Sequence, residues 1–147
     1  MIINIFYASW FGNGKKVVEE LSGILKNRGQ DVRLFNILEA DPENIPVAGL
    51  FVFSSPTRKF SLPTEVKNFI LNFKIPENMP GYALMTTYLD PRTIALKKME
   101  ELLNSRGMEK SAESLKVKAL GLKGPLEEGY KDRLEAFAGE IIKGEFS

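Results

Sequence analysis

Hydrophobic residues follow two alternating patterns along the chain. Short apolar or alternating runs predict five strands, at 2–8, 31–37, 47–53, 81–87 and 115–120. Apolar residues spaced along one helical face predict four helices, at 14–28, from Pro63 through Ile70, at 91–106 and at 127–143. An acidic connection containing two prolines takes the place of a helix between the second and third strands. This alternation predicts an α/β fold, a parallel sheet with helices on both faces.

The strand patterns also predict the order of the strands in the sheet. The first, third and fourth strands are apolar on both faces, as expected of buried central strands. The second carries Arg33 and the fifth Lys116 and Lys118 at alternate positions, and such side chains are typical of edge strands. Placing these two outside gives the order 2-1-3-4-5. This is a doubly wound, three-layer sandwich whose ligand crevice lies above the carboxyl ends of strands one and three.

The composition is that of one globular domain spanning residues 1–147, with 44% hydrophobic and 27% charged residues. Twenty Lys and Arg against 19 Asp and Glu leave a net charge of +1, which argues against a nucleic-acid-binding surface. The chain contains neither Cys nor His. Thiolate catalysis, the Ser-His-Asp triad and Cys or His metal sites are therefore excluded, and any redox chemistry depends on a bound cofactor.

Nothing in the sequence directs the chain to a membrane or out of the cell. Residues 1–5 have neither a basic region nor a small-residue cleavage site. The longest apolar run, 47–53, is far shorter than the ~20 residues that span a bilayer. We therefore expect a cytoplasmic protein with no membrane insertion.

Three loops are expected to meet above the crevice, at 9–15, 54–62 and 86–92. The first joins a buried strand to a helix N-terminus, where free backbone N–H groups and the helix dipole suit a phosphate. Gly12 and Gly14 allow close approach of the backbone to a ligand, and Ser9 and Asn13 add side-chain donors.

Three other signatures do not fit these loops. A Walker A loop requires Gly at position 9 and Ser or Thr at position 16, where this chain has Ser9 and Lys16. A dinucleotide fingerprint that starts at Gly12 requires Gly at position 17, where this chain has Val17. A receiver domain of the response-regulator kind requires an Asp at the end of the third strand, where this chain has Ser54-Ser55.

Two segments carry a resemblance to a known family. Phe6-Tyr7-Ala8-Ser9-Trp10-Phe11-Gly12-Asn13-Gly14 is similar to the phosphate loop of the flavodoxin family, in which a Ser precedes Thr-Gly-Asn-Thr or a close variant. Phe53-Ser54-Ser55-Pro56-Thr57, followed by Pro63, resembles the second flavin loop, often Gly-Ser-Pro-Thr-Tyr. The resemblance covers the whole chain in its order of elements, and the length is that of the short-chain type. It implies the flavodoxin-like fold and FMN as cofactor.

The resemblance assigns residues of all three loops to FMN. Ser9, Gly12, Asn13 and Gly14 would hold the phosphate, and Trp10 and Phe11 of the same loop would also contact the cofactor. The isoalloxazine ring would lie among Ser55, Pro56, Thr57, Arg58, Lys59, Phe60, Thr86, Thr87, Tyr88 and Asp90. Trp10, Phe60 and Tyr88 are candidates for aromatic contact with the cofactor. No residue is assigned as catalytic or as a metal ligand.

Two positions depart from the family pattern. Phe11 and Gly14 stand where the family usually has Thr, so two hydroxyl donors to the phosphate are absent. A hydrogen bond to a charged group is worth ~1.5–3 kcal/mol, so the loss is expected to weaken FMN binding. The backbone donors are retained.

The implied function is electron transfer by a flavodoxin-like carrier rather than by a stand-alone enzyme, with redox proteins as partners. Two alternatives remain open. One is a small FMN-dependent quinone or NAD(P)H oxidoreductase, acting on a small anionic or quinone substrate. The other is a non-redox module of the same fold that binds another phosphorylated ligand or a partner. Lys15, Lys16, Arg58, Lys59 and Arg92 would make this edge basic, which favours an anionic ligand.

Overall fold

The computed structural model describes residues 1–58, 61–91 and 94–144. The strands are β1 (Ile2–Tyr7), β2 (Asp31–Asn36), β3 (Leu50–Pro56), β4 (Gly81–Tyr88) and β5 (Leu115–Lys118). The helices are α1 (Asn13–Asn27), α2 (Thr64–Asn72), α3 (Ala95–Ser105) and α4 (Tyr130–Gly144). The chain therefore follows the predicted alternation, with a connection without a helix between β2 and β3.

All five strands lie parallel in one sheet of order β2-β1-β3-β4-β5, which confirms the predicted order. The central position of β1 is visible in its register, since Ile5 pairs with Leu34 of β2 on one side and with Val52 of β3 on the other. Consecutive strands β2 and β3 are separated by β1, so the chain changes winding direction between β1 and β3. In parallel sheets of this order the ligand crevice lies at that change.

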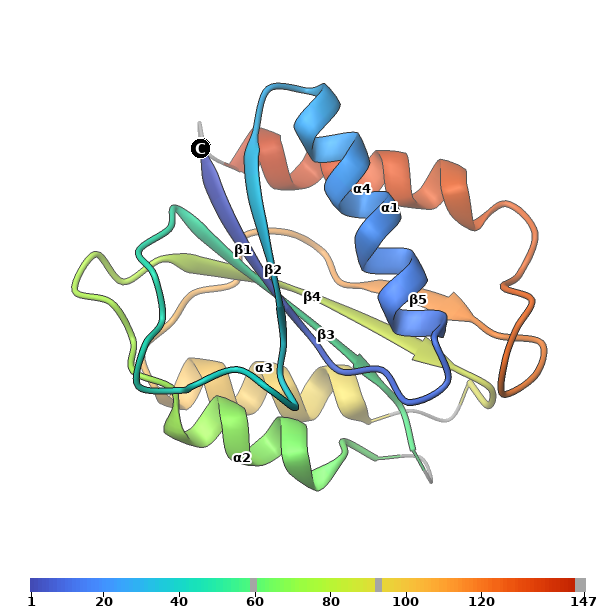
Figure 1. Ribbon diagram of the computed structural model, residues 1–147, viewed down its shortest axis with the longest axis horizontal. Helices are drawn as coiled ribbons and strands as arrows, with labels where there is room; N and C mark the ends of the chain where they lie inside the picture. Colours follow the sequence, from blue (N-terminus) through green and yellow to red (C-terminus); the bar gives the residue numbers. More distant parts are fainter. Residues whose placement is uncertain (59–60, 92–93, 145–147) are drawn as a thin grey trace.

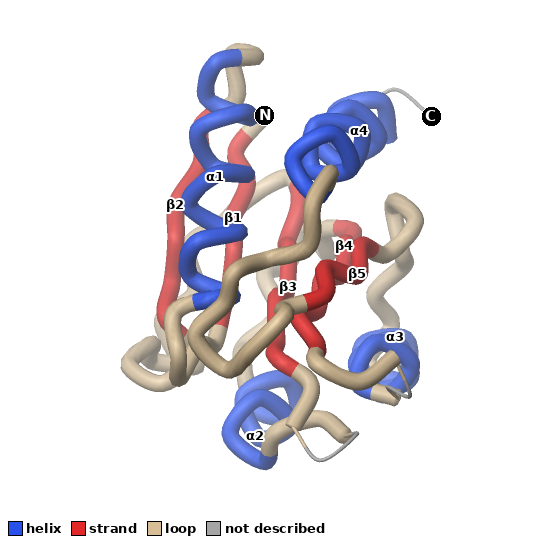
Figure 2. Tube along the Cα trace, turned by 90° about the vertical axis from the view of Figure 1, so that its right-hand side faces the viewer, coloured by secondary structure: helices blue, strands red, loops and turns tan. Residues whose placement is uncertain are grey.

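Helices α1 and α4 cover one face of the sheet, and α2 and α3 cover the other (Figures 1 and 2). Each face has its own buried cluster. The α1/α4 side is mainly aliphatic, whereas the α2/α3 side contains a group of phenylalanines around the fully buried Phe6. The ring of Phe6 stacks on those of Phe35 and Phe53 with centroids 5.2 Å apart in both pairs. These two layers hold the sheet rigid beneath the loops at its carboxyl edge.

Several predicted boundaries differ from the structure: the helix predicted at 91–106 spans Ala95–Ser105, and the strand predicted at 115–120 ends at Lys118. The strand predicted at 47–53 starts later, at Leu50, because Val47 is 63% exposed and its carbonyl accepts a hydrogen bond from Arg33 Nη2. The helix predicted at 127–143 begins at Tyr130, because the Glu127 N–H donates to the Lys118 carbonyl, 2.8 Å away. Gly129, at φ 84°, then redirects the chain into α4. None of the described helices is long and apolar enough to cross a membrane.

Candidate functional site

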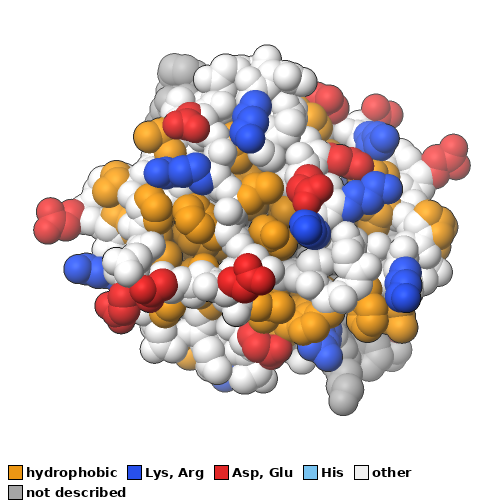
Figure 3. Space-filling model, viewed as in Figure 1, with side chains coloured by type: hydrophobic (Ala, Val, Ile, Leu, Met, Phe, Trp, Pro, Cys, Tyr) orange, Lys and Arg blue, Asp and Glu red, His pale blue; other side chains and the backbone are white. Residues whose placement is uncertain are grey.

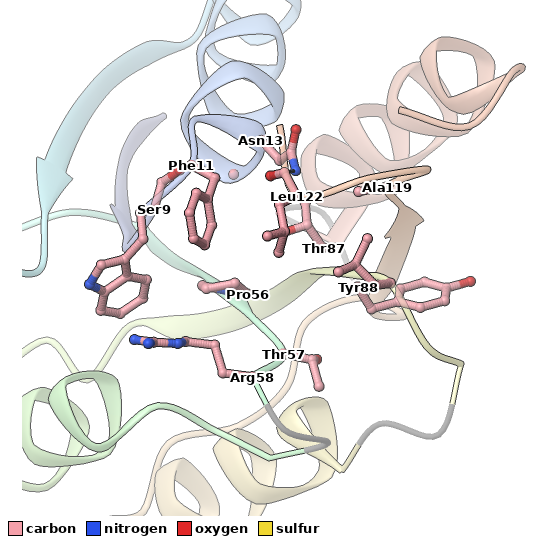
Figure 4. A pocket seen from close by; sticks show the side chains of 13 residues that line it. Ser9, Phe11, Asn13, Pro56, Thr57, Arg58, Thr87, Tyr88, Ala119 and Leu122 are labelled. Carbon is pink, nitrogen blue, oxygen red and sulfur yellow. Dashed lines mark hydrogen bonds between the residues drawn. The ribbon is translucent and has the colours of Figure 1, made fainter. Parts of the chain in front are cut away.

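A pocket opens at the carboxyl edge of the sheet, where parallel sheets of this order usually bind their ligands. Figure 4 shows how its walls come from four segments that are far apart in the sequence. The lining residues are Ser9, Trp10, Phe11, Asn13, Gly14, Pro56, Thr57, Arg58, Thr87, Tyr88, Leu89, Ala119 and Leu122. The loops after β1, β3 and β4 thus meet as predicted, and the loop after β5 joins them.

Most of the predicted contact residues lie on this pocket, and the others fall into three groups. Ser55 and Thr86 are 1% exposed and lie within the sheet beneath it. Gly12 and Asp90 belong to its loops without forming its lining. Lys59 and Phe60, together with Arg92, lie outside the described residues.

Leu89 lies in the predicted third loop, and two further residues, Ala119 and Leu122, line the pocket without having been predicted. The signal for the last two was the parallel sheet itself, since the carboxyl end of the fifth strand must lie on the same edge as the other four.

The β1–α1 loop presents a helix N-terminus to the pocket. Gly12 is the N-cap of α1 and has φ 94°, a conformation that favours glycine. Ser9 Oγ accepts the Gly12 N–H at 3.1 Å, and Lys16 N–H makes the first intrahelical bond to the Gly12 carbonyl at 3.0 Å. The N–H groups of Asn13, Gly14 and Lys15 precede that bond and have no acceptor within the helix. This geometry suits an anion at the start of α1.

Gly14 is buried where the loop returns against the end of β1. A Cβ at this position would lie 3.2 Å from the Ala8 carbonyl oxygen and 3.6 Å from Ser9 Cβ. Those atoms are backbone and the base of a side chain, which yield little. The sequence therefore has glycine here because the loop is closed tightly, and a threonine would not fit without a backbone shift.

The Asn13 side chain holds the β5–α4 loop against α1. Its Nδ2 donates to the Leu122 carbonyl at 3.0 Å. Gly124 lies against the same amide, since a Cβ there would be 3.3 Å from Asn13 Oδ1. The Asn13 side chain thus shapes the pocket by holding Leu122 in its wall. Its backbone N–H, at the start of α1, is the group of this residue that is available to an anion.

Hydroxyl groups tie β3 to β4 at the floor of the pocket. Thr86 Oγ1 donates to the Ser55 carbonyl at 2.7 Å, so the bond of 2.9 Å between the Thr57 and Thr86 hydroxyls is donated by Thr57. The Thr57 N–H donates to the Thr87 carbonyl at 2.9 Å. These bonds fix the start of the β3–α2 loop, from which Arg58 enters the site.

Two aromatic rings that line the pocket carry a cation against them. The Arg58 guanidinium carbon lies 4.7 Å from the centre of the Trp10 ring, and Lys116 Nζ lies 5.1 Å from the centre of the Tyr88 ring. A third ring, that of Phe11, is 51% exposed and projects into the pocket between Ser9 and Leu122 (Figure 4). The site therefore offers backbone N–H donors, positive charge and aromatic surface, a combination suited to a planar anionic ligand.

The described residues of this site offer few groups for acid–base or metal chemistry. In the described part of the chain, no group of three or more Asp and Glu side chains is placed to hold a metal ion. The lining contains no carboxylate, and Asp90 is the nearest along the chain, next to Leu89. What the arrangement can do chemically is bind and orient a ligand that brings its own reactivity.

Comparison with known proteins identifies the fold. No family model matches the sequence, and a search of curated proteins found no match. Among solved structures, the Streptococcus pneumoniae TIGR4 flavodoxin is 24% identical, with a TM-score of 0.82 over 97% of this chain and 99% of that one. An archaeal flavodoxin is 16% identical, with a TM-score of 0.83 over all of both chains.

A third likeness is to a larger protein. The rubredoxin oxygen:oxidoreductase of Desulfovibrio gigas is 20% identical, with a TM-score of 0.83 over 99% of this chain but 36% of that one. This chain therefore has the length of the flavodoxins it resembles and about a third of that oxidoreductase. It has the flavodoxin fold, as its element order and loops predicted.

Proposed function

We propose that this single-domain protein binds FMN non-covalently and carries electrons between partners, as flavodoxins do. The observation that carries the proposal is the glycine-lined N-terminus of α1, which opens on the pocket at the carboxyl edge of the sheet. The backbone N–H groups at 13–15 would hold the phosphate, with the Ser9 hydroxyl beside them. Tyr88, Thr57 and Arg58 would flank the isoalloxazine ring.

The residues present fit this cofactor. Gly12 has nothing within 4 Å of the place where a Cβ would stand, so the backbone is open to a phosphate on that side. Arg58 adds a cation to the pocket lining, which favours an anionic ligand. When bound, FMN supplies the redox chemistry. The protein binds it, orients it and sets the charge around it.

Electron carriage is favoured over the alternatives because the solved structures that this chain matches over nearly its whole length include flavodoxins. A small quinone or NAD(P)H oxidoreductase and a non-redox binding module stay predictions. So does the cytoplasmic location.

The test is a titration of the purified, flavin-free protein with FMN and with riboflavin. The chain has one tryptophan, Trp10, and it lines the pocket, so its fluorescence should be quenched as the flavin binds. FMN should bind more tightly than riboflavin by about tenfold or more, because a hydrogen bond from the protein to the charged phosphate is worth ~1.5–3 kcal/mol. Equal affinities for the two would contradict the phosphate assignment.

A glycine pair supplies a matched control. Gly12→Val should abolish FMN binding, because a β-branched side chain is strained at φ 94° and would displace the backbone N–H groups at 13–15. Gly29, beyond the other end of α1, has a similar φ of 87° and also has nothing within 4 Å of a built Cβ. Gly29→Val should therefore suffer comparable backbone strain but retain FMN affinity. Equal loss of binding in both variants would show that the effect is one of folding and not of the site.

A further inference from the structure

The loop between β5 and α4 folds back on itself as a small hairpin. Ala119 and Leu126 form an antiparallel bridge at its base. One residue nearer the tip, the Leu120 N–H donates to the Pro125 carbonyl at 2.8 Å. Residues 119–126, called the hairpin below, therefore form one unit that is held by bonds within itself.

The two ends of the hairpin are held differently. At the base, Ala119 and Leu126 are 3% and 8% exposed and belong to the aliphatic cluster on the α1/α4 side of the sheet. At the tip, Leu120 and Leu122 are 62% and 57% exposed. Figure 3, viewed as in Figure 1, shows hydrophobic side chains at the surface on the right, where this loop lies. The core thus fixes the base, whereas burial contributes little to holding the tip.

A side chain of α1 fastens the tip. Asn13 Nδ2 donates to the Leu122 carbonyl at 3.0 Å. Within the described part of the chain, this is the one hydrogen bond that joins residues 120–124 to another element. Asn13 and Leu122 lie next to each other in Figure 4, where the hairpin meets the first turn of α1. The position of Leu122 in the pocket wall therefore depends on the Asn13 amide.

The amide is directed at the hairpin through both of its polar atoms. Nδ2 donates to Leu122, and Oδ1 lies toward Gly124, since a Cβ at Gly124 would be 3.3 Å from it. The backbone N–H groups at 13–15 are the donors that the helix geometry offers to an anion. A phosphate bound to those groups does not need the Asn13 side chain.

We propose that Asn13 is a positioning residue, whose amide holds the hairpin as a wall against the part of the ligand beyond its phosphate. The inference rests on the proposed function for the identity of that ligand, a phosphorylated flavin. It differs from the family resemblance, which makes this side chain a phosphate donor. Leu122 and Ala119 offer apolar surface, so the part of the ligand that they contact is the uncharged part. The Asn13 bond should therefore matter equally for flavins with and without a phosphate.

The first experiment measures amide hydrogen exchange in the flavin-free protein. Asn13→Ala should speed the exchange of the Leu120 and Gly124 N–H groups by about threefold or more, because the tip opens more often without its bond. The matched control is Asn36→Ala. Asn36 Oδ1 accepts the Leu38 N–H at 3.0 Å at the same edge of the sheet, outside the pocket lining. Unchanged exchange in Asn13→Ala, or equal acceleration in both variants, would overturn the proposal.

The second experiment titrates the same variants with FMN and with riboflavin, following Trp10 fluorescence. Asn13→Ala should weaken the binding of both flavins by the same factor, between about threefold and tenfold. The ratio of the two dissociation constants should stay within about twofold of the parent ratio, and Asn36→Ala should bind both flavins normally. Weaker binding of FMN alone would assign the amide to the phosphate and overturn the proposal.

A third variant tests whether Asn13 acts through Leu122. Leu122→Ala shortens the side chain in the wall and leaves the carbonyl that Asn13 binds in place. It should weaken both flavins, and the loss in the double variant should be smaller than the product of the two single losses. Losses that multiply would show that the two residues act independently, against the proposal. Failure of the parent protein to bind either flavin, with faster tip exchange in Asn13→Ala, would overturn the proposed function and retain Asn13 as the residue that fastens the hairpin.

Discussion

At the scale of single residues, the two departures from the flavodoxin phosphate loop have different physical causes. Gly14 is fixed by space, since a Cβ would lie 3.2 Å from the Ala8 carbonyl oxygen. Phe11 is under no such constraint, because its side chain is half exposed and points into the pocket. One missing hydroxyl can therefore be restored without crowding the backbone, whereas the other requires a shift of a few tenths of an ångström at Ala8.

This difference gives a paired prediction. Phe11→Thr should tighten FMN binding by about tenfold or more, since a hydroxyl bond to the phosphate is worth ~1.5–3 kcal/mol. Gly14→Thr should instead lower the free energy of unfolding by about 1–3 kcal/mol, the usual cost of overpacking. FMN titration and urea denaturation measure the two effects. Phe11→Ala is the control, because it removes the ring without adding a hydroxyl. If Phe11→Ala tightens binding as much as Phe11→Thr, the ring obstructs the site and the hydroxyl contributes nothing.

At the scale of elements, the strand order was predictable because burial leaves a direct mark on sequence. β1, β3 and β4 are buried on both faces and appear as apolar runs, whereas Arg33 and Lys116 mark the two edges. The start of β3 was not predictable, since Val47 is as apolar as the strand residues but lies outside the sheet. The role of the β5–α4 loop in the pocket could not be predicted from the sequence either. Its contribution depends on a bond between Asn13 and the backbone of Leu122, and a backbone acceptor has no sequence signature.

The packing of α4 on α1 gives a prediction on pH. Tyr130 Oη donates to Glu20 Oε1 at 2.9 Å, joining the start of α4 to the middle of α1. Burial, with the bond to Glu20 and its negative charge, raises the pKa of Tyr130 from 10.0 to about 12. The folded state thus retains a proton that the unfolded chain releases above pH 10. The free energy of unfolding should therefore include a favourable contribution below about pH 10 that is lost as the pH rises toward 12.

Tyr130→Phe should make stability less sensitive to pH in this window, and it should cost about 1.5–3 kcal/mol at neutral pH through the lost bond to a carboxylate. Urea denaturation from pH 7 to pH 11.5 measures both effects. Tyr82 contributes to the pH dependence of stability in the same range, because burial and the charge of Glu100 raise its pKa to about 12 as well. Tyr82→Phe alone and the double variant separate the two contributions. A pH dependence in Tyr130→Phe identical to that of the parent would contradict the assignment.

At the scale of the whole molecule, the site exists only because the fold is complete. Asn13 and Leu122 are 109 residues apart, and Thr57 and Thr86 are 29 apart, yet both pairs bond at the pocket. The rigid sheet brings these loops together before any ligand is present. The unfolded chain has no equivalent arrangement, so an FMN molecule that binds the pocket should bind the native state alone.

This coupling gives a prediction on thermal stability. FMN at one hundred times its dissociation constant should stabilise the fold by about 2.7 kcal/mol, and raise its melting temperature by roughly 5–10 °C for a chain of this length. Because Lys15 and Lys16 lie in the first turn of α1 and Arg58 lines the pocket, added salt should weaken FMN binding and reduce the shift at a fixed FMN concentration. Riboflavin at that concentration should give a much smaller shift, with little dependence on salt.

Calorimetry with both flavins at two salt concentrations tests this, and Gly29→Val serves as a destabilised control that should keep the full FMN shift. A shift of the same size for riboflavin and FMN, unaffected by salt, would show that the flavin is held by its ring alone and that the N-terminus of α1 does not receive the phosphate.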